Sequence, residues 1–228
     1  MLVQQLNKKF FYGFCEVLIM VLSSFFLSCV TNPPEEMPGW EVSGADYVVE
    51  DDKVEVTDQS PDHISRTLTD AGIKSYKQLY KFFMANNPKA KKRQVKRLAR
   101  YYILECRIEG INSDCAFVQM CLETGFLRFG GLVTPDMHNY CGLGAMDQEH
   151  RGEVFPTEQM GVRAHVQHLH AYATTEDVEL VHPCIDRRYK YVKPRGKATT
   201  ITGLTKTWAM DPLYDQKLER LLVELEKY

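Results

Sequence analysis

The sequence lacks a charge bias, a cysteine pair at metal-binding spacing and a second long apolar run after the one near its N-terminus. The formal net charge of the 228 residues is −2, so composition gives no argument for a nucleic-acid partner. The seven cysteines form no CxxC pair and no Cys/His pattern of the kind that binds zinc. We therefore predict no bound metal, no cofactor and no nucleic-acid partner.

The N-terminal segment has the features of an export signal. Lys8 and Lys9 precede an apolar stretch that is cleanest over residues 17–27, and Glu16 interrupts the run, which is short for a bilayer span. Cys29 follows a small residue at the end of this stretch, as in a bacterial lipobox. We predict that residues 1–28 are a signal peptide and that Cys29 carries a lipid. The alternatives are an ordinary signal peptide and a retained anchor helix.

This interpretation predicts an exported, membrane-anchored lipoprotein that is periplasmic or at the cell surface. Disulfides are permitted there. Without Cys15 and Cys29 the number of cysteines is odd, so at least one is unpaired, and we assign no bridge. The five remaining cysteines are Cys106, Cys115, Cys121, Cys141 and Cys184.

Residues 29–62 are predicted to form a tether, and residues 63–228 one compact domain. The tether has sparse apolar residues, several prolines and an acidic run at residues 50–52. Such a segment cannot bury enough apolar surface to offset the entropy lost on ordering.

From residue 63 onward the apolar residues recur at helical spacing. Ser75 is a predicted N-cap, and Gly110 is predicted to end the second helix. The second helix begins with a very basic face, which could attract an anionic polymer, but we favour an ordinary solvated face. A strand or extended loop is expected over residues 184–205. The first predicted helix begins after Ser75. Four further helices are predicted at about residues 89–109, 113–124, 158–173 and 213–227.

The helix predicted at 113–124 is apolar on every side, which is typical of the centre of a domain. Its polar interior residues are Gln119 and Glu123, four apart and therefore on one face. Burial and the C-terminal end of a helix both raise the pKa of a carboxyl group. A carboxylic acid that stays protonated near neutral pH suits protonation of a leaving oxygen. The alternative is a structural Glu123 bound to an arginine or a backbone amide.

Five segments in order carry a resemblance to a known family. They are EGIN at 109–112, AFVQMCLETGFLRFGG at 116–131, NYCGLGA at 139–145, GVRAHVQHLHAYA at 161–173 and WAMDPLYDQKL at 208–218. This series resembles the glucosaminidase domain of glycoside hydrolase family 73, which includes bacterial autolysins and flagellar peptidoglycan hydrolases. The resemblance covers about residues 75–228.

The resemblance implies an α+β fold that is mostly α, similar to lysozyme, with a small β-lobe over a cleft. It implies hydrolysis of the β-1,4 bond between N-acetylglucosamine and N-acetylmuramic acid in peptidoglycan. The general acid of the family falls on Glu123, and a tyrosine near the reacting sugar falls on Tyr214. Trp208 begins the motif that contains Tyr214 and is predicted to contact substrate.

Glycosidases usually pair two carboxylates. In this family the second carboxylate lies in a lobe loop. The candidates here are Asp147, Glu149, Glu153 and Glu158, and we prefer Glu149 or Glu153. The acetamido group of the sugar could replace this carboxylate as an internal nucleophile.

Further substrate contacts are predicted at Gln119, Phe129, Asn139 and Tyr140. Arg163 is predicted to be a structural ion-pair partner. The histidines of the 158–173 helix, His165 among them, are interpreted as helix surface or core edge rather than metal ligands.

Two other functions fit the same features. A lytic transglycosylase would also use a single catalytic glutamate, and would leave 1,6-anhydro-muramic acid ends. A peptidoglycan-binding or assembly protein with little turnover would bind the wall without cutting it.

Overall fold

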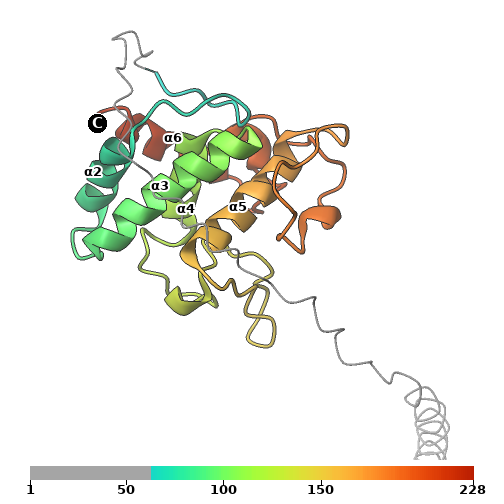
Figure 1. Ribbon diagram of the computed structural model, residues 1–228, viewed down its shortest axis with the longest axis horizontal. Coiled ribbons are helices and arrows are strands. Elements are labelled where there is room, and N and C mark those ends of the chain that lie inside the picture. The colour runs from blue at the N-terminus through green and yellow to red at the C-terminus, as the bar shows by residue number, and fades with distance from the viewer. Residues whose placement is uncertain (1–62) are drawn as a thin grey trace, which may run out of the picture. The chain divides into compact units, whose positions relative to one another are not determined.

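The computed structural model describes residues 63–228, and Figure 1 shows a bundle of helices joined by long loops. The N-cap prediction at Ser75 is confirmed, because its side chain and that of Gln78 form a reciprocal capping box. Gly110 is left-handed, with a φ of 69°, and ends its helix as predicted. The α-helices are α2 (Tyr76–Asn86), α3 (Lys92–Glu109), α4 (Ser113–Glu123), α5 (Glu158–Ala173) and α6 (Tyr214–Leu225), with short 3₁₀ helices η1 (Pro135–Met137), η2 (Tyr189–Tyr191) and η3 (Ile201–Leu204).

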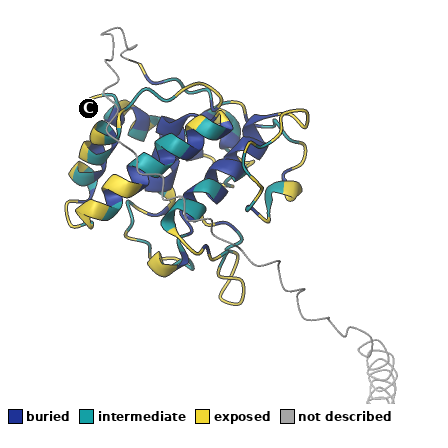
Figure 2. Ribbon diagram, in the orientation of Figure 1, coloured by how far each residue is buried: buried dark blue, intermediate teal, exposed yellow. Residues whose placement is uncertain are grey.

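Helix α4 is the centre of the domain, as its sequence predicts. Every residue from Ser113 to Cys121 is buried, and α4 contacts α2, α3, α5 and α6 (Figure 2). Asn112 caps its N-terminus, where the side-chain oxygen accepts from the backbone N–H of Asp114 at 3.0 Å and of Cys115 at 3.3 Å. The cap and the enclosing helices fix the axis of α4, and with it the position of Glu123 at the end of the helix.

Helices α3 and α5 are joined by a buried ion pair. Glu105 of α3 is completely buried and accepts from Arg163 Nε at 2.9 Å and Nη2 at 3.1 Å. Gln159 donates to the same carboxylate at 2.7 Å. The prediction that Arg163 is a structural ion-pair partner is confirmed.

The N-terminal end of the described chain is bound to α6. The Arg66 guanidinium contacts Glu219 and Glu226, each at 2.6 Å. Thr67 forms an isolated antiparallel bridge with Thr200, so residues 198–201 return to the core beside this segment. The prediction of an extended segment within residues 184–205 is confirmed at this bridge. Two short helices, η2 and η3, lie in the same range.

The predicted β-lobe is not seen among residues 63–228, where the only β-pairing is three isolated bridges. Residues 126–156 instead form turns, η1 and one bridge between Ala145 and Arg151. Gly142, Gly144 and Gly152 have positive φ, which keeps this segment turning and prevents a regular ladder. Within the described residues the five cysteines are all free.

No helix within residues 63–228 is long and apolar enough to cross a membrane. The predicted signal peptide, Cys29 with its predicted lipid and the whole predicted tether lie outside the described residues.

The Arg163–Glu105 pair gives a test of the core. Arg163→Met leaves a buried carboxylate without its partner, so we expect the free energy of unfolding to fall by about 3–5 kcal/mol in urea titrations. The control is Arg97→Met, which breaks the more exposed Arg97–Glu158 pair and should cost about 1 kcal/mol or less. Equal losses from the two substitutions would contradict a structural role for the buried pair.

Candidate active site

Glu123 is the last residue of α4 and meets two side chains from the C-terminal part of the chain. Trp208 Nε1 donates to Glu123 Oε1 at 3.1 Å, and the Tyr214 hydroxyl donates a short hydrogen bond to the same oxygen. Among the described residues no hydrogen-bond donor reaches the other carboxyl oxygen, Oε2. One oxygen of the carboxyl is therefore held by the protein, and the other is left for a ligand.

Protein atoms crowd the Glu123 carboxyl, although the residue keeps exposed surface. Burial raises the pKa of Glu123, and the hydrogen bonds from Tyr214 and Trp208 act in the opposite direction. The pKa of Tyr214 is raised by burial and by the neighbouring Glu123, so its hydroxyl stays protonated and can donate. This environment favours the proton-carrying form of Glu123 while leaving it within reach of a ligand.

Trp208 is held in place by α5. Its ring centroid lies 5.1 Å from those of His168 and Tyr172, and 5.7 Å from that of His165. The Trp208 backbone N–H donates to the Leu204 carbonyl at 2.9 Å. This aromatic packing fixes the direction of the indole N–H toward Glu123.

The turn after Glu123 has an unusual backbone. Gly125, Phe126, Leu127 and Phe129 have φ between 55° and 60°, a left-handed region that non-glycine residues rarely adopt. Phe126 packs on the rings of α2, and its carbonyl accepts from Asn87 Nδ2 at 2.8 Å. Such conformations cluster at functional sites, where the surrounding structure holds them in place.

Behind Tyr214 lies Gln119, which is only 1% exposed. Its Nε2 donates to the Tyr214 hydroxyl at 2.9 Å, and its Oε1 is 3.1 Å from His165 Nε2. Gln119 was predicted to contact substrate, but both ends of its amide are occupied inside the protein. In this structure it supports Tyr214 instead.

Asn139 and Tyr140, also predicted as sugar contacts, are each 1% exposed. The Asn139 side chain bonds the backbone of Leu143 in both directions at 2.9 Å and the Glu153 carbonyl at 3.1 Å. It holds the glycine-rich turn together, and Tyr140 belongs to the core. Burial corrects the direct-contact prediction for both residues, whereas Phe129 is half-buried beside the Glu123 turn.

None of the candidate second carboxylates forms a hydrogen bond or ion pair with Glu123 within the described part of the chain. Glu149 is exposed and Glu153 half-buried in the glycine-rich loop. Asp147 pairs with His150, and Glu158 pairs with Arg97. Glu149 and Glu153 thus remain candidates without a hydrogen bond or ion pair to Glu123.

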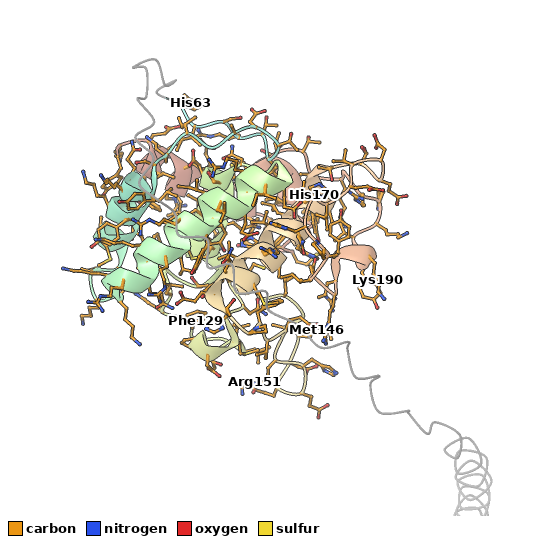
Figure 3. All side chains as sticks on the ribbon, viewed as in Figure 1. His63, Phe129, Met146, Arg151, His170 and Lys190 are labelled. Carbon is orange, nitrogen blue, oxygen red and sulfur yellow. The ribbon has the colours of Figure 1, made fainter. Side chains whose placement is uncertain are left out.

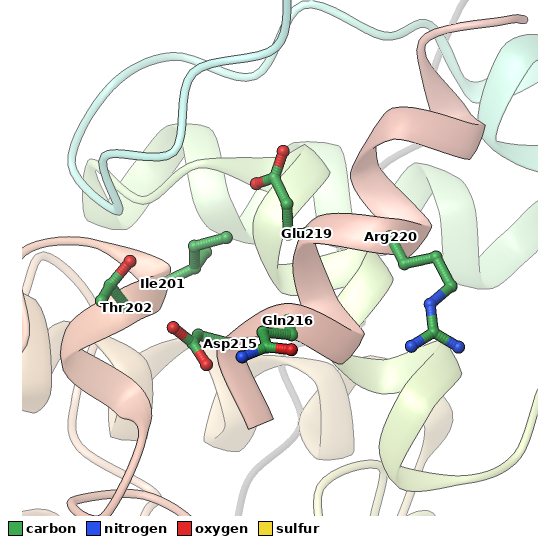
Figure 4. Close-up of a pocket in the computed structure, with 6 residues that line it drawn as sticks. All are labelled: Ile201, Thr202, Asp215, Gln216, Glu219 and Arg220. Carbon is green, nitrogen blue, oxygen red and sulfur yellow. The ribbon is translucent and has the colours of Figure 1, made fainter. Parts of the chain in front are cut away.

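A separate hollow lies between η3 and α6 (Figure 4) and is lined by Ile201, Thr202, Asp215, Gln216, Glu219 and Arg220. Its lining includes neither Glu123 nor Trp208, and its Glu219 is bound to Arg66. The hollow is therefore separate from the Glu123 carboxyl and its two donors. Figure 3 shows Phe129, Met146 and Arg151 at the loop-rich lower edge of the domain.

Sequence reasoning missed His165 and Tyr102 as parts of this site. Both are completely buried, and Tyr102 Oη lies 2.8 Å from His165 Nδ1. In the sequence, His165 is one of three histidines on one helix. Tyr102 is one of several residues on the apolar face of another helix. The only available signal was that His165 occupies an apolar helix without an acidic partner.

The chain matches the family model "Mannosyl-glycoprotein endo-beta-N-acetylglucosaminidase" over residues 99–227. It is also 41% identical over 161 residues to an uncharacterized protein of Borreliella burgdorferi. The aligned region covers 71% of this chain and 78% of that protein. No solved structure matches the chain significantly. The matched range contains Glu123, Trp208 and Tyr214, and the chain belongs to the glucosaminidase family, glycoside hydrolase family 73.

Proposed function

We propose that this protein is an endo-β-N-acetylglucosaminidase that cuts the β-1,4 bond between N-acetylglucosamine and N-acetylmuramic acid in peptidoglycan. Family membership supports a glycoside hydrolase of the peptidoglycan type. The observation that carries the proposal is the Glu123 carboxyl, which has one oxygen bonded to Trp208 and Tyr214 and the other unoccupied by the described residues.

In the proposed reaction, Glu123 donates the proton on Oε2 to the glycosidic oxygen as the C1–O bond breaks. The developing positive charge at C1 is met by the acetamido oxygen of the same sugar or by a second carboxylate. Water then attacks C1 and returns a proton to Glu123. Glu149 and Glu153 are the preferred candidates for that carboxylate, and the acetamido route is the alternative that needs neither of them.

The same observation favours one second candidate function, a lytic transglycosylase. There the 6-hydroxyl of the muramic acid, rather than water, would attack C1 of that sugar. The two reactions leave different products, since only the transglycosylase forms 1,6-anhydro-muramic acid ends. A wall-binding protein with little turnover would form neither product, and the raised pKa of Glu123 argues for chemistry.

A lysozyme-like fold is part of the proposal. The buried helix α4, which carries the acid at its end, supports the helical half of that comparison. The loops of residues 126–156 are where a lobe opposite the acid would have to form.

The first test digests peptidoglycan with the full-length chain and identifies the products by mass spectrometry. We expect new reducing-end N-acetylglucosamine. Glu123→Gln should lower turnover by at least about 100-fold, because an amide cannot donate the catalytic proton. Its melting temperature should be kept, since an amide oxygen still accepts from Trp208 and Tyr214.

The control is Glu179→Gln, the same change at an exposed position, which should leave turnover unaltered. A folded Glu123→Gln variant with wild-type turnover would exclude Glu123 as the acid. Products with 1,6-anhydro-muramic acid ends and no reducing-end N-acetylglucosamine would show that the enzyme is a lytic transglycosylase and not a hydrolase.

We also propose export, cleavage before Cys29 and lipid attachment to Cys29. In cells fed a labelled fatty acid, Cys29→Ser should abolish labelling of the protein. Cys15→Ser, which alters a cysteine inside the predicted signal peptide, should not. Equal labelling of both variants would refute the anchor.

A further inference from the structure

Glu123 is the end of a chain of hydrogen bonds that begins in the core between α3 and α5. Tyr102 Oη lies 2.8 Å from His165 Nδ1, and His165 Nε2 lies 3.1 Å from Gln119 Oε1. Gln119 Nε2 donates to Tyr214 at 2.9 Å, and Tyr214 donates to Glu123. The chain therefore crosses α3, α5, α4 and α6, and all of its members before Glu123 are buried.

The direction of every bond in this chain follows from its two ends. A phenol has one proton, so Tyr214 can donate to Glu123 only if Gln119 presents its NH₂ to the tyrosine oxygen. The Gln119 oxygen then faces His165, whose Nε2 must carry a proton. A neutral His165 consequently accepts at Nδ1, and the Tyr102 hydroxyl donates this hydrogen bond.

The opposite direction would require a different protonation of Glu123. If Gln119 were turned over, Tyr214 would donate to the Gln119 oxygen, and Glu123 would have to place its own proton on Oε1. That proton would point into the protein. Trp208 opposes this arrangement, because an indole N–H can only donate and it is directed at Oε1.

The buried partners keep the neutral forms that this direction needs. Burial and the neighbouring His168 lower the pKa of His165 to about 3, so its ring is neutral at physiological pH. Burial raises the pKa of Tyr102, whose hydroxyl therefore keeps its proton. Hydrogen bonds in such a chain polarise one another, and a bond accepted from Gln119 makes Tyr214 a stronger donor.

We propose that Tyr102, His165 and Gln119 are positioning residues that hold Tyr214 as a donor to Glu123 Oε1 and so confine the catalytic proton to Oε2. The inference rests on the proposed function for the role of that proton. It concerns residues that touch no substrate and act only through Tyr214.

The direction of the chain is read from the tautomer of His165. In ¹⁵N-detected NMR of the full-length protein, with the His165 signals assigned from a His165→Asn variant, we expect the proton on Nε2. A proton on Nδ1 alone would overturn the proposal. In Tyr102→Phe the bond to Nδ1 is lost while the Gln119 oxygen still accepts from Nε2, so we expect the proton to stay on Nε2 and only the Nδ1 signal to shift.

The catalytic consequence is measured on a soluble glycan fragment of alternating N-acetylglucosamine and N-acetylmuramic acid. Gln119→Met removes both bonds of the amide at similar side-chain length, and we expect kcat to fall about tenfold with KM changed less than twofold. Tyr102→Phe, three hydrogen bonds away from Tyr214, should lower kcat in the same way but less.

The matched control is Tyr189→Phe. Tyr189 Oη lies 3.0 Å from Nδ1 of His170, another histidine of α5, but this pair has no hydrogen-bonded link to Glu123 among the described residues. Tyr189 is only half-buried, so Tyr189→Phe should lose less stability than Tyr102→Phe and should keep kcat. Equal kcat in Tyr102→Phe and Tyr189→Phe, both folded at the assay temperature, would overturn the proposal even if Gln119→Met failed to fold.

The proposed activity and the direction of the hydrogen bonds are tested separately. A wild-type chain that cleaves no glycan would refute the proposed function and with it the catalytic role of the chain. The His165 tautomer would still decide the direction of the hydrogen bonds, because it is read without turnover.

Discussion

The burial of α4 on every side is the constraint on which the rest of the domain depends. A helix with no solvated face must be enclosed, and α2, α3, α5 and α6 do this. The enclosure places the end of α4 beside residues that are distant in sequence, so Glu123 meets Trp208 and Tyr214. The position of the Glu123 carboxyl is thus a consequence of core packing rather than of a flexible loop.

Two opposing influences act on the Glu123 carboxyl. Burial raises its pKa, whereas donors on one oxygen stabilise the charged form and lower it. A general acid has to carry a proton near the working pH and still release it, so neither influence alone would serve. The donors sit on one oxygen only, which separates the part of the carboxyl that the protein holds from the part that a substrate could meet.

The helices could be predicted from the sequence because local patterns specify them, whereas the assignment of Glu123 as the acid depends on the family resemblance and stays a prediction. The Ser75 cap, the left-handed Gly110 and the all-apolar α4 each depend on neighbouring residues only. The roles of Asn139 and Tyr140 could not be predicted from the sequence, because the same polar group can face a sugar or a buried turn. His165 and Gln119 meet only through tertiary packing, so their spacing in the sequence carries no sign of it. The predicted β-lobe is not found in the described residues, because glycine-rich segments fit turns as well as hairpins.

The central claim is that Oε2 of Glu123 delivers the proton to the glycosidic oxygen. The most direct measurement is a crystal structure of the full-length Glu123→Gln variant with an uncleaved glycan fragment. The account predicts the glycosidic oxygen within about 3 Å of the side-chain atom at position 123 that is not bonded to Trp208 and Tyr214. A glycan whose scissile bond lies beyond hydrogen-bonding reach of position 123, for example in the hollow between η3 and α6, would contradict it.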